Sequence, residues 1–117
     1  MLEASLERDG EVHKVSLLPV ENAVLAFFYD GTFKIGTLAV STPGVREGGP
    51  GTSSVLLGGK YLIAARALAE RVAATYTKMS IVSINTKLSE GEALRLYASL
   101  LDKARSRTNA DSASSKG

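Results

Sequence analysis

Two Asp-Gly dipeptides constrain the fold of this chain more than any other local feature. Asp9-Gly10 and Asp30-Gly31 each stand between two segments in which strand-forming residues alternate. Asp-Gly supplies the two positive-φ positions of a type I′ turn, which joins neighbouring antiparallel strands. The pattern therefore predicts one hairpin from strands at 2–8 and 11–18, and a second from strands at 23–29 and 32–41.

The rest of the chain alternates between loop, strand and helix patterns. A Gly/Pro-rich stretch at 42–52 predicts a long loop. Ser89 and Glu92 fit a capping box, so a helix is expected to start there. Apolar periodicity and β-branched residues predict the remaining elements: a strand at 53–57, an alanine-rich helix at 60–76 and a strand at 79–85.

The order of these elements, ββββ-β-α-β-α, predicts an α+β fold. Hairpin-linked strands favour a largely antiparallel sheet of about six strands, with both helices packed on one face. A length of 117 residues suits one domain. We expect that domain to span 1–104, and the Ser/Ala/Asn/Asp-rich segment 105–117 to be a disordered polar tail.

The predicted second hairpin is apolar on both sides. Its turn would pair Phe28 with Phe33 and Ala26 with Ile35 on one face. The other face would carry Leu25, Phe27, Tyr29, Leu38 and Val40. Two helices can cover only one face, so we expect a second subunit on the other, with Phe27, Tyr29 and Leu38 as its contact residues. The alternatives are that these three are core residues, or that the first hairpin curls over to close the sheet towards a barrel.

Composition argues against catalytic and metal chemistry. The chain has no cysteine and one histidine, His13, and its carboxylates are not spaced as metal ligands. We therefore expect no enzyme activity and no cofactor, with His13 in a structural or surface role. The net charge is +2. Residues 105–117 account for all of it, because residues 1–104 hold eleven basic and eleven acidic side chains. Such a neutral body predicts no nucleic-acid partner.

The same residues give expectations about location. Met1 to Glu7 are acidic and alternating rather than basic and then apolar, so we expect no export signal and a cytoplasmic protein. No apolar run approaches the roughly 20 residues that cross a bilayer, so no membrane partner is expected.

Glycine-rich stretches leave a ligand-sensing function open. Gly58-Gly59-Lys60 lies between a predicted strand and a predicted helix, where amides could hold an anion. A P-loop would need glycine at Ser54 and Ser or Thr at Tyr61, so the match is poor. The stretch 48–51 is interpreted as a mobile binding loop or a solvated connector. A nucleotide or small-molecule sensor using these two stretches remains a weaker hypothesis.

Several short sequence segments, in their order and spacing, resemble a known family. These are Phe33-Lys34-Ile35-Gly36-Thr37-Leu38, Ser54-Val55-Leu56-Leu57-Gly58 with the alanine-rich helix, and Ile81-Val82-Ser83-Ile84-Asn85-Thr86-Lys87 with the capped helix through Glu92-Ala93-Leu94. Together they cover about Ala23 to Ala104 and resemble the third member of the eukaryotic proteasome assembly chaperones, here as a simpler, archaeal-type homologue. The Gly/Pro loop and the polar tail depart from the family pattern.

The resemblance implies a dimeric α/β chaperone without enzymatic activity. Such proteins bind α-type subunits of the 20S proteasome and aid assembly of the α-ring. For partner contact we single out Arg46 and Glu47, with Lys34 and Lys60 as weaker candidates. The alternative is a small dimeric scaffold subunit of another complex, with no proteasome contact.

Overall fold

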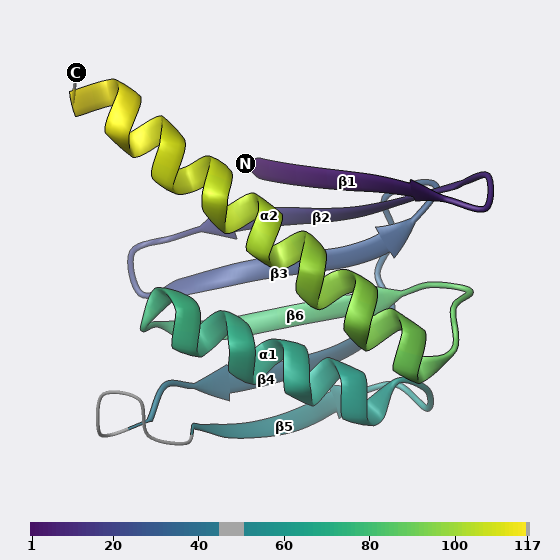
Figure 1. The fold of residues 1–117 in the computed structure, drawn as a ribbon. Helices are drawn as coiled ribbons and strands as arrows, with labels where there is room; N and C mark the ends of the chain where they lie inside the picture. Colours follow the sequence, from purple (N-terminus) through teal and green to yellow (C-terminus); the bar gives the residue numbers. More distant parts are fainter. Residues whose placement is uncertain (45–50, 117) are drawn as a thin grey trace.

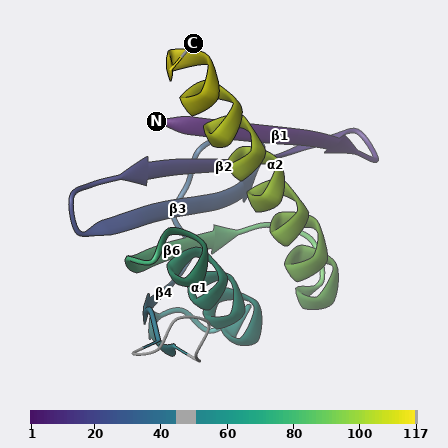
Figure 2. The same ribbon diagram turned by 60° about the vertical axis from the view of Figure 1, so that its left-hand side comes forward.

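The computed structural model describes residues 1–44 and 51–116, with side chains as far as Ser106. It is an α+β fold in which one six-stranded sheet carries both helices on one face (Figures 1 and 2). In chain order the elements are β1 (Leu2–Arg8), β2 (Glu11–Pro19), β3 (Ala23–Asp30), β4 (Thr37–Thr42), β5 (Thr52–Leu57), α1 (Leu62–Tyr76), β6 (Met79–Asn85) and α2 (Glu90–Lys116).

The first hairpin forms as predicted. Leu2 pairs with Leu17 and Leu6 with His13 across β1 and β2. Asp9 and Gly10 have φ values of 52° and 79°, the two positive values that a type I′ turn requires. Here a local turn signal was sufficient, because the strands that it joins are also neighbours in the sheet.

The second predicted hairpin is wrong. The strand order is β1-β2-β3-β6-β4-β5, so β6 lies between β3 and β4. β3 pairs with β6 in parallel, so the sheet is mixed, although its other four strand pairs are antiparallel as predicted. Residues 31–36 form a connection instead of the start of a strand, and β4 begins only at Thr37.

The central position of β6 has a physical reason in its sequence. Met79–Asn85 is rich in β-branched residues, and Ser80, Val82, Ser83 and Ile84 are all buried. A strand buried on both faces is best placed in the middle of a sheet, with partners on both sides. This long-range pairing outweighs the hairpin that Asp30-Gly31 would form, and in the structure only Gly31 has a positive φ there.

The hydrophobic core lies between the sheet and the two helices. Its largest members are Tyr97, Phe28, Leu17, Leu68 and Ile84. Helical spacing accounts for this packing: Ala65, Ala69 and Val72 of α1 and Tyr97, Leu101 and Ala104 of α2 recur at that spacing and are buried. Leu62 has the same spacing but is 42% exposed, because it occupies the first turn of α1, beyond the edge of the core.

The helix α2 is longer than the sequence predicted. We placed 105–117 in a polar tail, whereas the helix continues to Lys116. No Gly or Pro interrupts the sequence between Glu92 and Lys116, and alanine and arginine favour the helix. Burial ends earlier, since Ala104 is buried while Arg105 and Ser106 are exposed.

The sheet is open, with β1 and β5 as its two edges, so the predicted alternative of a barrel is not adopted. Neither α1 nor α2 is, over the described residues, both long and apolar enough to cross a membrane.

The second helix begins with the predicted capping box: Ser89 Oγ lies 3.4 Å from the Glu92 amide and donates to Glu92 Oε1 at 2.9 Å.

Candidate functional site

The face of the sheet away from the helices, called the open face here, is largely apolar. Alternation along β3 sends Val24, Ala26 and Phe28 into the core and the intervening side chains to the open face. Cross-strand register then builds one apolar row across four strands, formed by Leu18, Leu25, Ile81 and Val40. A sheet face of this composition is typical of a protein-contact surface.

The predicted contact residues share this face. Phe27 and Leu38 lie in one row on either side of Ser83, to which both are paired. Tyr29 lies one row further along β3, opposite Asn85. The structure thus brings Phe27, Tyr29 and Leu38 together, although through β6 rather than through the hairpin that the sequence suggested.

Phe33 belongs to the open face. The predicted register had placed it on the opposite face, with Phe28. Its ring centroid lies 5.0 Å from that of Phe27 and 5.0 Å from that of Tyr29. Phe33 itself is 50% exposed, while Tyr29 is 4% exposed. The connection 31–36 therefore lies over the end of the open face and adds exposed aromatic surface there.

Gly36 holds this connection close to the sheet. Its amide donates to Ser83 Oγ at 3.0 Å, and Asn85 Nδ2 donates to the Ile35 carbonyl at 3.0 Å. A Cβ on Gly36 would lie 2.2 Å from the Ile84 carbonyl oxygen, so only glycine fits. A glycine within a predicted strand was the available sign that this segment is not a regular strand and that Phe33 and Ile35 face elsewhere.

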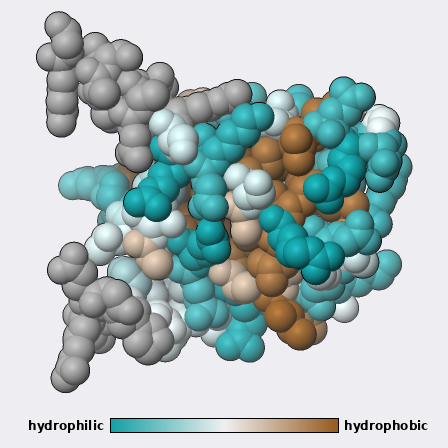
Figure 3. Space-filling view, in the orientation of Figure 1, coloured by the Kyte–Doolittle hydropathy of each residue, from teal (hydrophilic) through white to brown (hydrophobic). Residues whose placement is uncertain are grey.

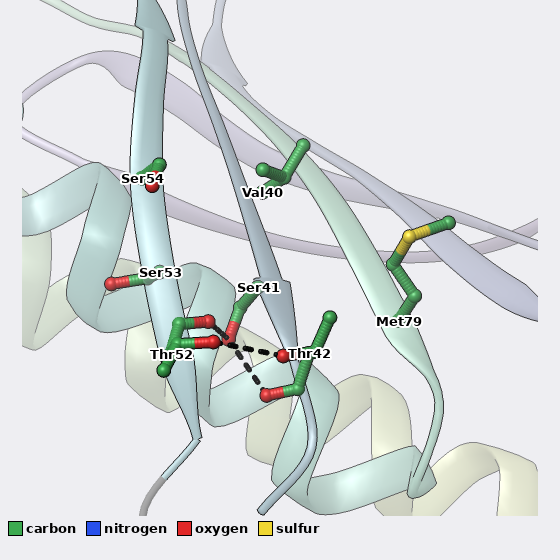
Figure 4. A pocket seen from close by; sticks show the side chains of 7 residues that line it. All are labelled: Val40, Ser41, Thr42, Thr52, Ser53, Ser54 and Met79. Atoms are coloured by element: carbon green, nitrogen blue, oxygen red, sulfur yellow. Dashed lines mark hydrogen bonds between the residues drawn. The ribbon is translucent and has the colours of Figure 1, made fainter.

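A small hollow lies at the end of β4 and the start of β5 (Figure 4). It has a volume of about 110 Å³, and its walls are Val40, Ser41, Thr42, Thr52, Ser53, Ser54 and Met79. The hydroxyls of Thr42 and Thr52 lie 2.9 Å apart and so satisfy each other. Short side chains leave this space, which is large enough for a few atoms of a neighbouring molecule and offers no charged group.

Two of the four predicted partner-contact residues, Arg46 and Glu47, lie outside the described residues. Lys34 is one-third exposed, and its ammonium contacts the buried Asp30 carboxylate at 3.0 Å. Lys60 is exposed, and no described residue pairs with its ammonium. Its backbone carbonyl accepts a hydrogen bond from Thr37 Oγ1 at 2.6 Å. Of the two lysines, Lys60 is the one whose charge is available to a partner.

Asp30 organises the end of the parallel pair β3 and β6. Burial raises the pKa of Asp30, but hydrogen bonds from the Lys87 amide, Thr86 Oγ1 and Lys34 outweigh it and hold the pKa below 3.8. Asp30 is therefore a buried, ionised carboxylate that accepts three hydrogen bonds. Such a group orders the surrounding turns and is 2% exposed to solvent.

The backbone amides at the start of α1 bind a carboxylate from α2. Glu90 Oε2 accepts hydrogen bonds from the amides of Ile63 and Ala64 at 2.9 and 3.1 Å. These are the amides that a phosphate would need after Gly58-Gly59-Lys60. A carboxylate from the chain thus occupies the position that the nucleotide-sensor hypothesis requires.

A shallow groove of about 470 Å³ lies beside this helix start. Tyr61 forms its floor, with its hydroxyl 2.7 and 2.6 Å from the carbonyl oxygens of Thr86 and Leu88. Burial and the nearby carboxylates of Asp30 and Glu90 raise the pKa of Tyr61, which keeps that hydroxyl protonated and donating. Leu62 and Ile63 form an exposed apolar rim. Figure 3 shows that hydrophobic surface is exposed between hydrophilic residues on the side of the molecule that carries the helices.

His13 is buried and bonded within the core. Its Nδ1 lies 3.1 Å from the hydroxyl of Tyr97, and both side chains are at most 2% exposed. Burial also raises the pKa of Tyr97. This pair is closed off from solvent and holds β2 against α2, in keeping with the structural role expected of His13.

Among the side chains of residues 1–44 and 51–106, no three His, Cys, Asp or Glu converge as a metal site would require. The features that reach the surface are instead an apolar sheet face and an apolar-rimmed groove beside one free lysine. No protein-family model and no curated protein matches the sequence.

Proposed function

We propose that this chain is a protein-binding subunit that works like a proteasome assembly chaperone, binding α-type subunits of the 20S proteasome to aid α-ring assembly. The observation that carries the protein-binding part is the apolar open face, where Phe27, Leu38 and Phe33 reach the surface. The choice of partner rests on the resemblance of the segments between Ala23 and Ala104. On this proposal the protein acts in the cytoplasm and has no catalytic activity of its own.

The open face is proposed to bind a second copy of the chain. Two sheets packed face to face bury such apolar rows about 10 Å apart. Residues 1–104 carry no net charge, so two copies approach without overall repulsion. Phe27 and Leu38 are the central contacts. Tyr29 is nearly buried in the single chain, so it contributes by packing against Phe33, which is exposed.

The α-type subunit is proposed to bind on the side of the sheet that carries the helices, beside the start of α1. Lys60 provides a free cation there, and Leu62 and Ile63 provide 42% and 70% exposed apolar side chains. Lys34 contributes less, because Asp30 already neutralises it. A small, mixed surface suits a complex that must dissociate once ring contacts form.

The test is a pull-down of separate recombinant α- and β-type proteasome subunits, with the molar mass of the bait measured by light scattering. We expect selective capture of an α-type subunit by a multimeric bait, and a loss of capture in Lys60→Glu. Leu38→Lys should weaken self-association, whereas Val20→Lys, at a 42% exposed position in the turn beyond the end of β2, should not.

The outcomes separate the two parts of the proposal. Capture of neither subunit class by a self-associated protein overturns the partner and leaves the open-face contact standing. A wild-type monomer at all concentrations, or equal behaviour of Leu38→Lys and Val20→Lys, overturns the open-face contact.

A further inference from the structure

The outer edge of β5 has no neighbouring strand in the described part of the chain, and the part from Thr52 to Val55, before the register shift at Leu56, is regular. β5 pairs with β4 on one side, and in Figure 1 it is the lowest strand, with no described element beyond it. Alternate backbone amides and carbonyls of an edge strand point outwards and lack partners within the sheet. The strand reads Thr-Ser-Ser-Val-Leu-Leu, without the charge or proline that commonly blocks pairing with another strand.

The other edge of the same sheet is protected. β1 carries Glu3, Glu7 and Arg8, and charged residues on an edge oppose strand addition. Lys103 Nζ also donates to the Ser5 carbonyl at 2.9 Å, which occupies one backbone acceptor of β1. The difference between the edges makes β5 the one at which another strand can be added.

We infer that β5 pairs antiparallel with β5 of a second copy, which continues the sheet across a two-fold axis. The charges beside the strand favour a second copy over an unrelated peptide. Arg66 Nε and Glu70 Oε2 flank the Ser53 hydroxyl at 3.2 and 2.7 Å, one helical turn apart on α1. A two-fold axis at Ser53 reverses the direction of α1 and so places each Arg66 near the other copy's Glu70.

This contact is independent of the open-face contact proposed above. It uses the edge of the sheet and the adjoining side of α1, whereas the other uses the face opposite the helices. Either contact alone gives a two-fold dimer. Both together close into a tetramer only if the two axes intersect at a right angle, and otherwise build an open chain of dimers.

The experiment measures molar mass against concentration by light scattering for the full chain and four variants. Arg66→Glu and Glu70→Arg each place like charges across the proposed axis and should weaken the edge contact at least about tenfold. The double exchange R66E/E70R restores opposite charges and should recover association. Leu38→Lys removes the open-face contact, so any dimer that it still forms reports on the β5 contact. Thermal melts of the diluted proteins confirm that each variant is folded.

The results decide between the two contacts. Weakening by both single exchanges and recovery in the double variant support β5 pairing, even if Leu38→Lys has no effect and the open-face contact fails. Association that is unchanged in folded Arg66→Glu and Glu70→Arg, or not recovered in the double variant, overturns it. Hydrogen exchange gives a second measurement: β5 amides should exchange more slowly in the associated protein than in the dissociated one, and equal rates contradict the pairing.

Discussion

The Glu90 carboxylate, at the first residue of α2, lies 2.9 Å from the backbone amide of Ile63 at the start of α1. One helix therefore supplies the N-terminal cap of the other. Tyr61, just before α1, has no side-chain cap of its own and adopts a left-handed conformation with φ of 58°. The two helix starts and the groove beside them are consequently one structural unit.

Removal of this cap should destabilise the fold. Glu90→Ala leaves the amides of Ile63 and Ala64 without their acceptor, at an expected cost of about 1–2 kcal/mol in the free energy of unfolding. Urea unfolding measures this cost. Glu21→Ala, at an exposed turn position, is the control and should change stability by less than about 0.5 kcal/mol. Equal effects of the two changes would contradict the capping role.

The same cap predicts the response to nucleotides. Because Glu90 already holds the amides after Gly58-Gly59-Lys60, wild-type protein should show no thermal shift with ATP, GTP or inorganic phosphate at millimolar concentration. A reproducible rise in melting temperature with one nucleotide would revive the sensor hypothesis and require another binding position.

Gly36 should tolerate no side chain. In Gly36→Ala the new Cβ would meet the Ile84 carbonyl oxygen at 2.2 Å, and the connection would move off the sheet. We expect a loss of about 1–3 kcal/mol in the free energy of unfolding. Gly59→Ala is the matched control, because no atom lies within 4 Å of its added Cβ and its φ is not positive. A control as unstable as Gly36→Ala would refute the steric explanation.

Asp30 makes stability depend on acidic pH. Its pKa in the folded protein lies below the ordinary value of 3.8, so the folded state favours the ionised carboxylate. The resulting stabilisation is present above the unfolded-state pKa of about 3.9 and is lost as the pH falls through the lower, folded value. Asp30→Asn should be less stable at neutral pH and should lack this part of the acid dependence. Parallel slopes for both proteins below pH 4 would argue against it.

The end of α2 should be dispensable for association. Ala104 is the last buried residue among the side chains that the structure describes, and neither proposed self-contact uses residues after it. A chain ending at Ser106 should therefore keep the wild-type oligomeric state in light scattering. A smaller assembly would show that the end of the helix contributes to a contact.

Local sequence patterns determined much of this structure. Asp9-Gly10 set the first hairpin and its register, because both positive-φ residues and the alternating flanks act between chain neighbours. The Ser89–Glu92 capping box set the start of α2 for the same reason. Alternation along β3 and β4 also placed Phe27, Tyr29 and Leu38 on one face, since side-chain direction in a strand depends only on its period of two.

Tertiary structure alone decided which strands are neighbours. Burial of Val82 and Ile84 draws β6 between β3 and β4, and that gain exceeds what a local turn at Asp30-Gly31 provides. The insertion moved Phe33 to the open face and left β5 as an uncharged edge. The Glu90 cap and the Asp30 network likewise join residues far apart in the sequence. Local sequence sets the direction of each side chain, whereas the strand order, and with it the available surfaces, follows from the burial of the whole core.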